Sequence, residues 1–458
     1  MDFVRRLDNL LELETPYSEV NTVRHNKIFY TSTKPNPFKH DDVISSILQF
    51  SSLFIKLTVM CFVDKSFCNA IKRNKNTWRN TPILLDSQVI GSLIGNDLIA
   101  TTIHELIIKA SRVHIWGAMN NCGIFFMNLH TLCISYNHHS FDSMFLAVYL
   151  YEAISTIQSL RSLALIGLRH VVYETTDDEN EISSSLLLEN IYLERVTCTT
   201  HLCKLLKSSC ETLTDLSFIS CDEFDDAVTT LIILFSSSVN LQKLRISNST
   251  FHLLTLFTQK LIYLSLDTDA SLFSQLKEEF SIGILKLIQN AKNVNLQLEE
   301  PEGGYIEAVL IPWWYYLFNK NTLESKRLRI QDSDLFHCNN PPLHKIETLV
   351  LHNVRVSKTF YDNALLNANL KLVVVFIKED KHVLELQIKP LDGLNKMEKL
   401  RRSYKESNKT ILFFRLPSSP QTIWINEYTM YDSMKEFEEQ FPDDFAFAMA
   451  LTEIQYGK

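Results

Sequence analysis

Few groups of residues in this sequence could carry out chemistry, and each falls short of a complete site. His104 and Glu105 begin a string that resembles HExxH, but Ile108 stands where the second histidine of a zinc motif belongs. The acidic string 222–226 lacks the glycine and the terminal glutamate of an EF-hand calcium loop. No P-loop, GxGxxG fingerprint or GxSxG elbow is present. We therefore expect no catalytic site and no cofactor, and predict that the chain is not an enzyme.

The cysteines contain the nearest approach to a metal cluster. The chain has nine of them at irregular spacings, and the tightest group is Cys198, His201, Cys203 and Cys210. No second CxxC pair exists to complete a tetrahedral zinc site. We interpret the cysteines as reduced thiols that mostly pack as small apolar side chains, and we expect no bound metal.

The charge balance bears on the class of partner. Lys and Arg number 45 against 53 Asp and Glu, so the formal net charge is −8 and no global basic field attracts nucleic acid or anionic lipid. No apolar stretch approaches the roughly 20 residues that span a bilayer, and the first residues lack the order of a signal peptide. We expect a cytoplasmic or nuclear protein with neither a nucleic-acid nor a membrane partner.

The strongest pattern is a short apolar unit, LxxLxL, that recurs between residues 100 and 377. It stands at LHTLCI, LRSLAL, LENIYL, LTDLSF, LQKLRI, LIYLSL, AKNVNL, LRI, IETLVL and LKLVVV. Its middle position moves from Leu132 to Val373 in nine steps that average about 27 residues, and Cys221 follows one unit where a turn is expected. This period and these units resemble leucine-rich repeats.

Such a unit cannot bury both of its faces alone. A short strand alternates inward leucines with outward residues, and the chain returns as a helix that covers the strand layer, so neighbouring units must stack into a parallel ladder. Gly and Pro together make up about 5% of the chain, less than half their usual share, which argues against turn-rich all-β folds. The helices expected between strands include 144–157, 199–208, 225–236 and 272–289.

A second resemblance lies before the repeats. An acid followed by Val43, a Leu-rich turn, a Val-x-x-x-aromatic helix and a later Trp78 resemble the F-box over about 40 residues. Lys39-His40 replaces the usual Leu-Pro, and Phe67 stands for the usual Trp. The chain is thus similar to F-box and leucine-rich-repeat proteins, the substrate receptors of Skp, cullin and F-box ubiquitin ligases.

The resemblance implies an α/β architecture in which a three-helix F-box-like module precedes a leucine-rich-repeat solenoid, a horseshoe with parallel strands inside and helices outside. The expected parts are an N-terminal extension at 1–37, the F-box-like domain at 38–85, the repeats at 86–380, and a C-terminal cap and acidic tail at 381–458. The implied function is non-catalytic: the F-box binds the Skp adaptor on the cullin scaffold, and the repeats bind an unknown protein target. The alternative is a leucine-rich-repeat interaction scaffold without a ligase link, whose first 80 residues are a helical cap.

Two sets of site residues follow. The residues expected to contact the adaptor are Val43, Ile44, Ile47, Leu48, Leu57, Val63 and Trp78. The residue between the last two apolar positions of each unit should point away from the core and contact the target. These positions are Tyr192, Ser217, Arg245, Ser265, Asn295, Arg329 and Val350. Their chemistry is mixed, so they specify no class of target.

The pattern changes after residue 380. A basic helix-like stretch carries Lys396, Lys399, Arg401, Arg402, Lys405 and Lys409. Interleaved glutamates favour a solvated helix face over a phosphate-binding or nuclear-import role. A strand-like TILFFRL follows, and residues 432–444 then hold six acids against one lysine, with four phenylalanines at 437–447. This composition indicates a docking helix or cap more than a free acidic tail.

Overall fold

We describe the protein from a computed structural model. It describes residues 83–86, 103–110, 126–136, 147–168, 186–198, 200–223, 236, 238–247, 259–269, 287–299, 326–331, 334–335, 345–352, 354–356, 358–377, 390–415 and 432–449. The chain divides into two compact units, unit 1 made of residues 1–213, 222–228 and 453–458, and unit 2 made of residues 214–221 and 229–452.

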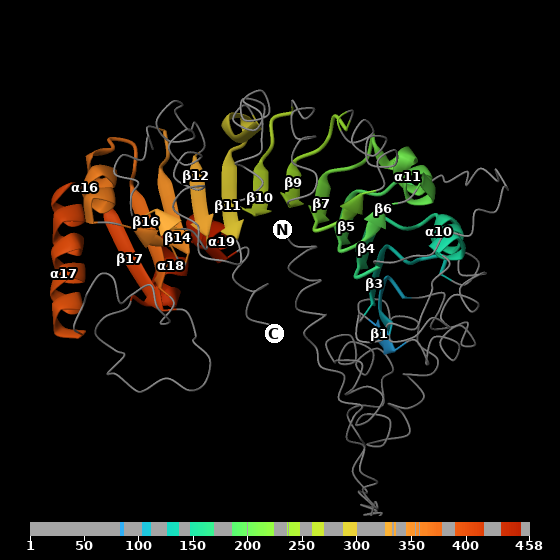
Figure 1. The fold of residues 1–458 in the computed structure, drawn as a ribbon, viewed down its shortest axis with the longest axis horizontal. Helices are drawn as coiled ribbons and strands as arrows, with labels where there is room; N and C mark the ends of the chain where they lie inside the picture. Colours follow the sequence, from blue (N-terminus) through green and yellow to red (C-terminus); the bar gives the residue numbers. More distant parts are fainter. Residues whose placement is uncertain are drawn as a thin grey trace, which may run out of the picture. The chain divides into compact units, whose positions relative to one another are not determined.

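Unit 1 contains parallel strands covered by short helices (Figure 1). The strands follow one another in chain order as β1 (Ile83–Asp86), β2 (Glu105–Ala110), β3 (Thr131–Tyr136), β4 (Ser162–Ile166) and β5 (Asn190–Glu194). The helices are α10 (Ala147–Ser155) and α11 (Thr200–Leu206), the latter continued by a 3-10 turn, η4 (Lys207–Ser209). A short pair, β6 (Thr197–Cys198) and β8 (Asp222–Glu223), lies beyond the main strands.

Unit 2 repeats this arrangement with more strands. They are β7 (Asp215–Ile219), β9 (Lys243–Ser247), β10 (Tyr263–Asp269), β11 (Asn293–Glu299), β12 (Arg327–Gln331), β14 (Thr348–His352), β16 (Leu372–Ile377) and β17 (Thr410–Arg415), each parallel to the next. A short pair, β13 (Asp334–Leu335) and β15 (Arg355–Val356), follows β12 and β14. Helices α16 (Lys358–Leu366) and α17 (Pro390–Glu406) lie on one side of these strands, and α18 (Met434–Gln440) and α19 (Pro442–Met449) lie on the other (Figure 1).

The strand register follows the apolar repeat of the sequence. All ten predicted LxxLxL segments fall on strands. Their middle positions pair across the ladder, as Leu132 does with Leu163 in unit 1 and Leu328 with Leu349 in unit 2. These four side chains are fully buried. The parallel order and the period of about 27 residues fit a leucine-rich-repeat solenoid.

A backbone motif recurs at the start of several strands. The carbonyl of His130 accepts hydrogen bonds from two successive amides, those of Arg161 and Ser162, at 2.9 Å each. In unit 2 the carbonyl of Glu347 likewise accepts from the amides of Lys371 and Leu372. These repeats therefore start on the previous one in the same geometry, which helps to hold the register constant along the ladder.

Side-chain hydroxyls join neighbouring repeats. Ser159 donates to the carbonyl of Leu129 at 2.8 Å, and Thr212 donates to that of Leu188 at 2.8 Å. These bonds satisfy backbone carbonyls at the junction between loop and strand. Cys221, expected at such a turn, is buried, and its Sγ donates to the carbonyl of Ile219.

The remaining expectations about elements have mixed outcomes. Helices at 147–155 and 200–206, a helix at 390–406 and a strand at 410–415 confirm four predictions. The helix expected at 225–236 falls, except for residue 236, outside the described residues, as does most of the one expected at 272–289 and all of the F-box-like module before residue 83. Strand β1 spans the expected domain boundary at residues 85 and 86 and pairs with β2. Among the described residues, no helix is both long and apolar enough to cross a bilayer.

Candidate functional site: the inner face of unit 2

The candidate site is the strand face of unit 2 that carries α18 and α19, which we call the inner face. Side chains alternate along each strand, so every second residue points to this face. Register aligns them in rows. The middle row is Ser217, Arg245, Ser265, Asn295, Arg329 and Val350. The first row, two residues earlier in each strand, is Asp215, Lys243, Tyr263, Asn293, Arg327 and Thr348.

The middle row contains all the target-contact positions predicted in unit 2, brought together by register as the repeat predicts. They are not on an open surface, however. Ser217, Ser265, Asn295, Arg329 and Val350 are at most 2% exposed, and only Arg245 is partly exposed. For Arg329 the physical reason is α19, which packs over its side chain and accepts its hydrogen bond.

Polar contacts run along the centre of the inner face. Asn295 donates to the hydroxyl of Ser265 at 2.9 Å, from one strand to the next. Burial raises the pKa of the Tyr263 phenol, and the nearby guanidinium groups of Arg329 and Arg245 oppose that rise. Nε and Nη1 of Arg245 and Oδ1 of Asn295 are buried and make no hydrogen bond within the part of the chain that the structure describes. The centre of the face therefore holds hydrogen-bonding capacity that this part of the chain does not use.

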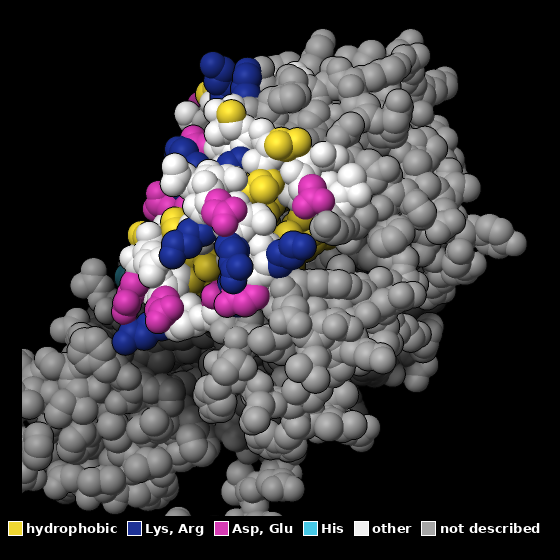
Figure 2. Space-filling view, turned by 90° about the vertical axis from the view of Figure 1, so that its left-hand side faces the viewer, with side chains coloured by type: hydrophobic (Ala, Val, Ile, Leu, Met, Phe, Trp, Pro, Cys, Tyr) yellow, Lys and Arg dark blue, Asp and Glu magenta, His cyan; other side chains and the backbone are white. Residues whose placement is uncertain are grey.

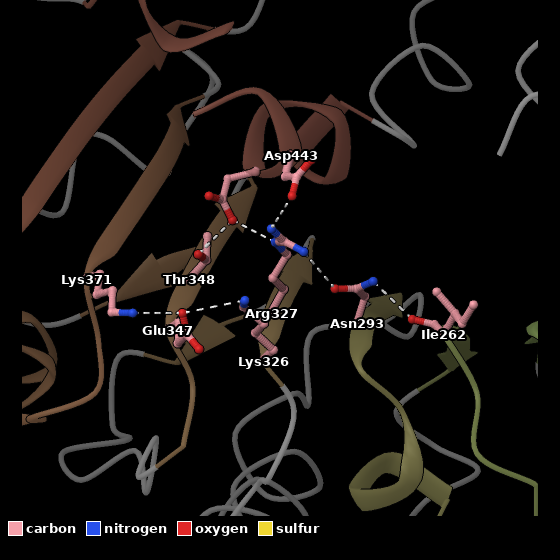
Figure 3. A network of polar contacts seen from close by, with 9 residues as sticks. Ile262, Asn293, Lys326, Arg327, Glu347, Thr348, Lys371 and Asp443 are labelled. Atoms are coloured by element: carbon pink, nitrogen blue, oxygen red, sulfur yellow. Dashed lines mark hydrogen bonds and ion pairs between the residues drawn. The ribbon is translucent and has the colours of Figure 1, made fainter. Parts of the chain in front are cut away.

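The first row forms a connected polar network, shown in Figure 3. Asn293 donates to the carbonyl of Ile262 at 3.0 Å and accepts from Arg327 at 3.5 Å. Arg327 in turn binds Asp444 of α19, with Nε and Oδ1 2.7 Å apart, and the same oxygen accepts from the Thr348 hydroxyl at 2.8 Å. One carboxylate thus bridges β12 and β14.

An exposed ion-pair cluster flanks this network. Oε2 of Glu347 lies 3.0 Å from Nζ of Lys371 and 3.8 Å from Nζ of Lys326 (Figure 3). The hydrogen bond from Lys371 holds the pKa of the Glu347 carboxyl below its usual value. Because all three side chains are solvated, the cluster contributes little to stability.

The inner face becomes aromatic toward β17. In the next row the rings of His352, Phe376 and Phe414 follow one another with centroids 5.5 and 5.4 Å apart. Phe437 of α18 stacks on Phe414 at 5.4 Å, and Phe445 of α19 meets Phe437 edge-on. The acidic, aromatic C-terminal stretch is therefore two packed helices, in keeping with the docking segment that its composition indicates. It lies across the strand face, and Asp432, just before it, bonds the outer edge of β17.

The other predicted site residues lie elsewhere. Tyr192 is in β5 of unit 1, where its hydroxyl donates to Glu194 at 2.7 Å. The adaptor-contact residues Val43, Ile44, Ile47, Leu48, Leu57, Val63 and Trp78 lie outside the described residues. Arg327, Thr348 and Asp444 belong to the site although the repeat pattern did not predict them as contact positions. The alternation of side chains that identified Arg329 also places Arg327, two residues earlier in the strand, on the inner face. The same alternation could therefore have predicted the first row.

The basic stretch of α17 has the mixed surface expected of a solvated helix face. Figure 2 views this end of unit 2 and shows cationic and anionic side chains interleaved with apolar ones. Glu398, Lys399, Arg402, Lys405 and Glu406 are all exposed. No field of a single sign covers this surface.

Among the described side chains no three potential metal ligands come together, but those of Cys198 and His201 lie outside them, so the absence of a metal at the cysteine cluster stays a prediction. Cys203 is buried on α11, and desolvation raises the pKa of its thiol to about 12. It therefore packs as an apolar side chain at neutral pH.

Comparisons with known proteins give little beyond this geometry. No family model matches the chain, and no curated protein matches it. Among solved structures the chain is similar to the plant peptide hormone receptor RGFR1 in complex with RGF2, with 12% sequence identity and a TM-score of 0.23. The match covers 74% of this chain and 57% of the receptor chain, so the chain spans little more than half of that length. The assignment of the fold rests on the strand register and the repeat period, not on this likeness.

Proposed function

We propose that the chain is a non-catalytic target-recognition subunit that binds a protein through the inner face of its repeats and joins a ubiquitin ligase through residues 38–85. The observation that carries the first half is the row of polar side chains from successive strands. Arg245, the partly exposed member of this row, supplies a cationic side chain that a partner can reach.

The second half depends on the F-box resemblance of the sequence. On this proposal, Ile47 and Leu48 pack against the Skp adaptor, and the cullin scaffold brings a ubiquitin-conjugating enzyme near the bound target. The subunit performs no bond chemistry and acts by raising the effective concentration of target lysines at the transfer site.

Co-purification with the Skp adaptor tests the ligase link. Wild-type chain should retain the adaptor at micromolar concentration, and the double variant Ile47→Asp with Leu48→Asp should lose it. A matched control places the same charges at apolar side chains that are already exposed, Met127→Asp with Leu366→Asp, and should retain the adaptor. Adaptor binding that survives the first pair, or is absent from wild type, contradicts the ligase proposal and leaves the interaction scaffold.

Target recognition needs a separate readout. Mass spectrometry of proteins captured with wild-type chain, compared with Arg245→Glu, should show a target that the variant loses while the adaptor remains. Arg245 suits this test because it is the partly exposed member of the middle row, so its replacement disturbs the core least. An unchanged set of captured proteins contradicts a target role for this row.

A further inference from the structure

We propose that the part of the inner face under α18 and α19 is a docking site for a short acidic helix of the protein target, and that the chain's own C-terminal helices occupy it otherwise. We call the covered residues the helix-docking patch: Arg327, Arg329, Thr348 and Phe414. The inference rests on the proposed function, since it specifies the kind of target that the inner face takes.

Two arginines of one strand hold two points of one helix. Arg327 binds the Asp444 carboxylate at 2.7 Å, and Nη1 of Arg329 donates to the carbonyl of Ala448 at 2.9 Å. Four residues of helix rise about 6 Å, and two residues of strand rise about 6.6 Å. The spacing of Arg327 and Arg329 therefore matches one helical turn and aligns α19 along β12 in the same direction.

This spacing specifies what a helix needs in order to fit. The carbonyl of Ala448 belongs to the last turn of α19, where carbonyls have no partner inside the helix. An acid at one position and a free carbonyl four residues later occur together only near the end of a helix. The patch thus fits a helix that carries an acid about one turn before its C-terminal end, as α19 does.

The charges and rings around the patch support an acidic, aromatic occupant. The side chain of Arg327 is 11% exposed and that of Asp444 19% exposed, so the ion pair is largely removed from water. The guanidinium also lies 3.6 Å from the exposed carboxylate of Asp443, so two successive acids of α19 compensate its charge, and Asp444 is the closer and less exposed of the two. Phe437, seven residues before Asp444, adds the ring that stacks on Phe414.

The helices that occupy the patch are suited to exchange. Helix α18 has seven residues and α19 has eight, and isolated helices below about 12–15 residues are marginal in water. Their helical state therefore depends on docking. Asp432, two residues before α18, is bonded to Phe413 of β17, so the helices stay close to the patch, and short connections of this kind give an effective concentration in the millimolar range. A target helix in solution must compete with this concentration.

A labelled peptide tests the exchange on the full chain. The probe is a synthetic peptide of residues 432–449 with a fluorophore at its N-terminus, measured by anisotropy. The chain variant Phe437→Ala with Asp444→Asn loosens the resident helices and should bind the probe at least ten-fold more tightly than wild type. Adding Arg327→Ala should abolish the gain, and a probe carrying Asp444→Asn should bind at least ten-fold more weakly. The matched chain control, Glu438→Gln with Glu439→Gln, removes two exposed acids of α18 and should behave as wild type.

Hydrogen exchange on wild-type chain covers the case in which a variant misfolds. Saturation with the same peptide, isotopically labelled so that its fragments are distinguishable, should accelerate exchange at residues 434–449 of the chain. Unchanged exchange, or a double variant that binds the probe no better than wild type, overturns the inference. Neither readout involves the Skp adaptor or Arg245, so a failure of this inference is distinguishable from a failure of the proposed function.

Discussion

The residue directly after a strand adopts a left-handed backbone at three places in the ladder. Gly167 follows β4 with φ 75°, Arg195 follows β5 with φ 51°, and Ser220 follows β7 with φ 47°. The next residue is buried in each case, as with Leu168 and Val196. The turn returns the chain to the core, and two of the three sites achieve it without glycine, at a cost of about 1–2 kcal/mol for an L-residue.

We expect Gly167→Ala to lower the free energy of unfolding by about 1 kcal/mol, because alanine is disfavoured at this φ. The amide of Gly167 donates to the carbonyl of Glu194 at 2.8 Å, and alanine keeps that donor, so the effect isolates backbone conformation. Urea denaturation followed by circular dichroism measures it. The reverse change at the equivalent position, Ser220→Gly, should be neutral or stabilising. A loss of stability in both variants would show that the left-handed turn is not the controlling feature.

At the scale of elements, the outer edge of β17 is closed by a residue from a distant part of the chain. The Asp432 carboxylate accepts the backbone amide of Phe413 at 2.7 Å and Nη2 of Arg401 at 2.8 Å, and its own amide donates to the carbonyl of Phe413. Arg401 also lies over the Phe413 ring at 5.5 Å. An open strand edge is a template for pairing with another chain, so this contact protects the end of the ladder.

We expect Asp432→Ala to destabilise unit 2 by about 1–3 kcal/mol, since it leaves a buried amide and a guanidinium without their carboxylate. The freed edge should also increase self-association, measured by light scattering during mild heating. The control is Lys435→Ala, three residues away, which removes only an exposed i,i+4 pair with Glu439 and should change stability by no more than about 0.5 kcal/mol. Equal behaviour of the two variants contradicts an edge-protecting role for Asp432.

The elements show which features a sequence can predict. The strands were predictable because Leu132, Leu163 and Leu328 recur at a period that has one physical solution, a stacked ladder. The helical state of the C-terminal stretch was also readable from its acids and rings. Its position was not, because Arg327 and Asp444 are 117 residues apart and no local pattern links them. For the same reason the burial of Arg329 could not be foreseen, although its row could.

At the scale of the whole molecule, a ladder of this kind is held by contacts between nearest neighbours. Each strand bonds only to the strands beside it, and amides at the start of a repeat bond to backbone carbonyls of the repeat before. The free energy of unfolding is then close to a sum of one term for each repeat and one for each interface between repeats. Local opening can therefore be confined to one segment of the ladder. The division into two compact units gives this segmental behaviour a natural boundary.

Paired core truncations test how far cooperativity extends. Leu163 in β4 and Leu349 in β14 are fully buried at the middle position of their strands, one in each unit. Leu→Ala at either position should remove about 2–5 kcal/mol locally, because the cavity cannot be refilled by distant units. Hydrogen exchange should accelerate in β3, β4 and β5 for Leu163→Ala and in β12, β14 and β16 for Leu349→Ala. Each variant serves as the control for the other. Exchange that rises uniformly through both units in either variant would mean that the ladder opens as one cooperative structure. Only a global unfolding transition lets a local cavity raise the exchange rate of strands that do not contact it.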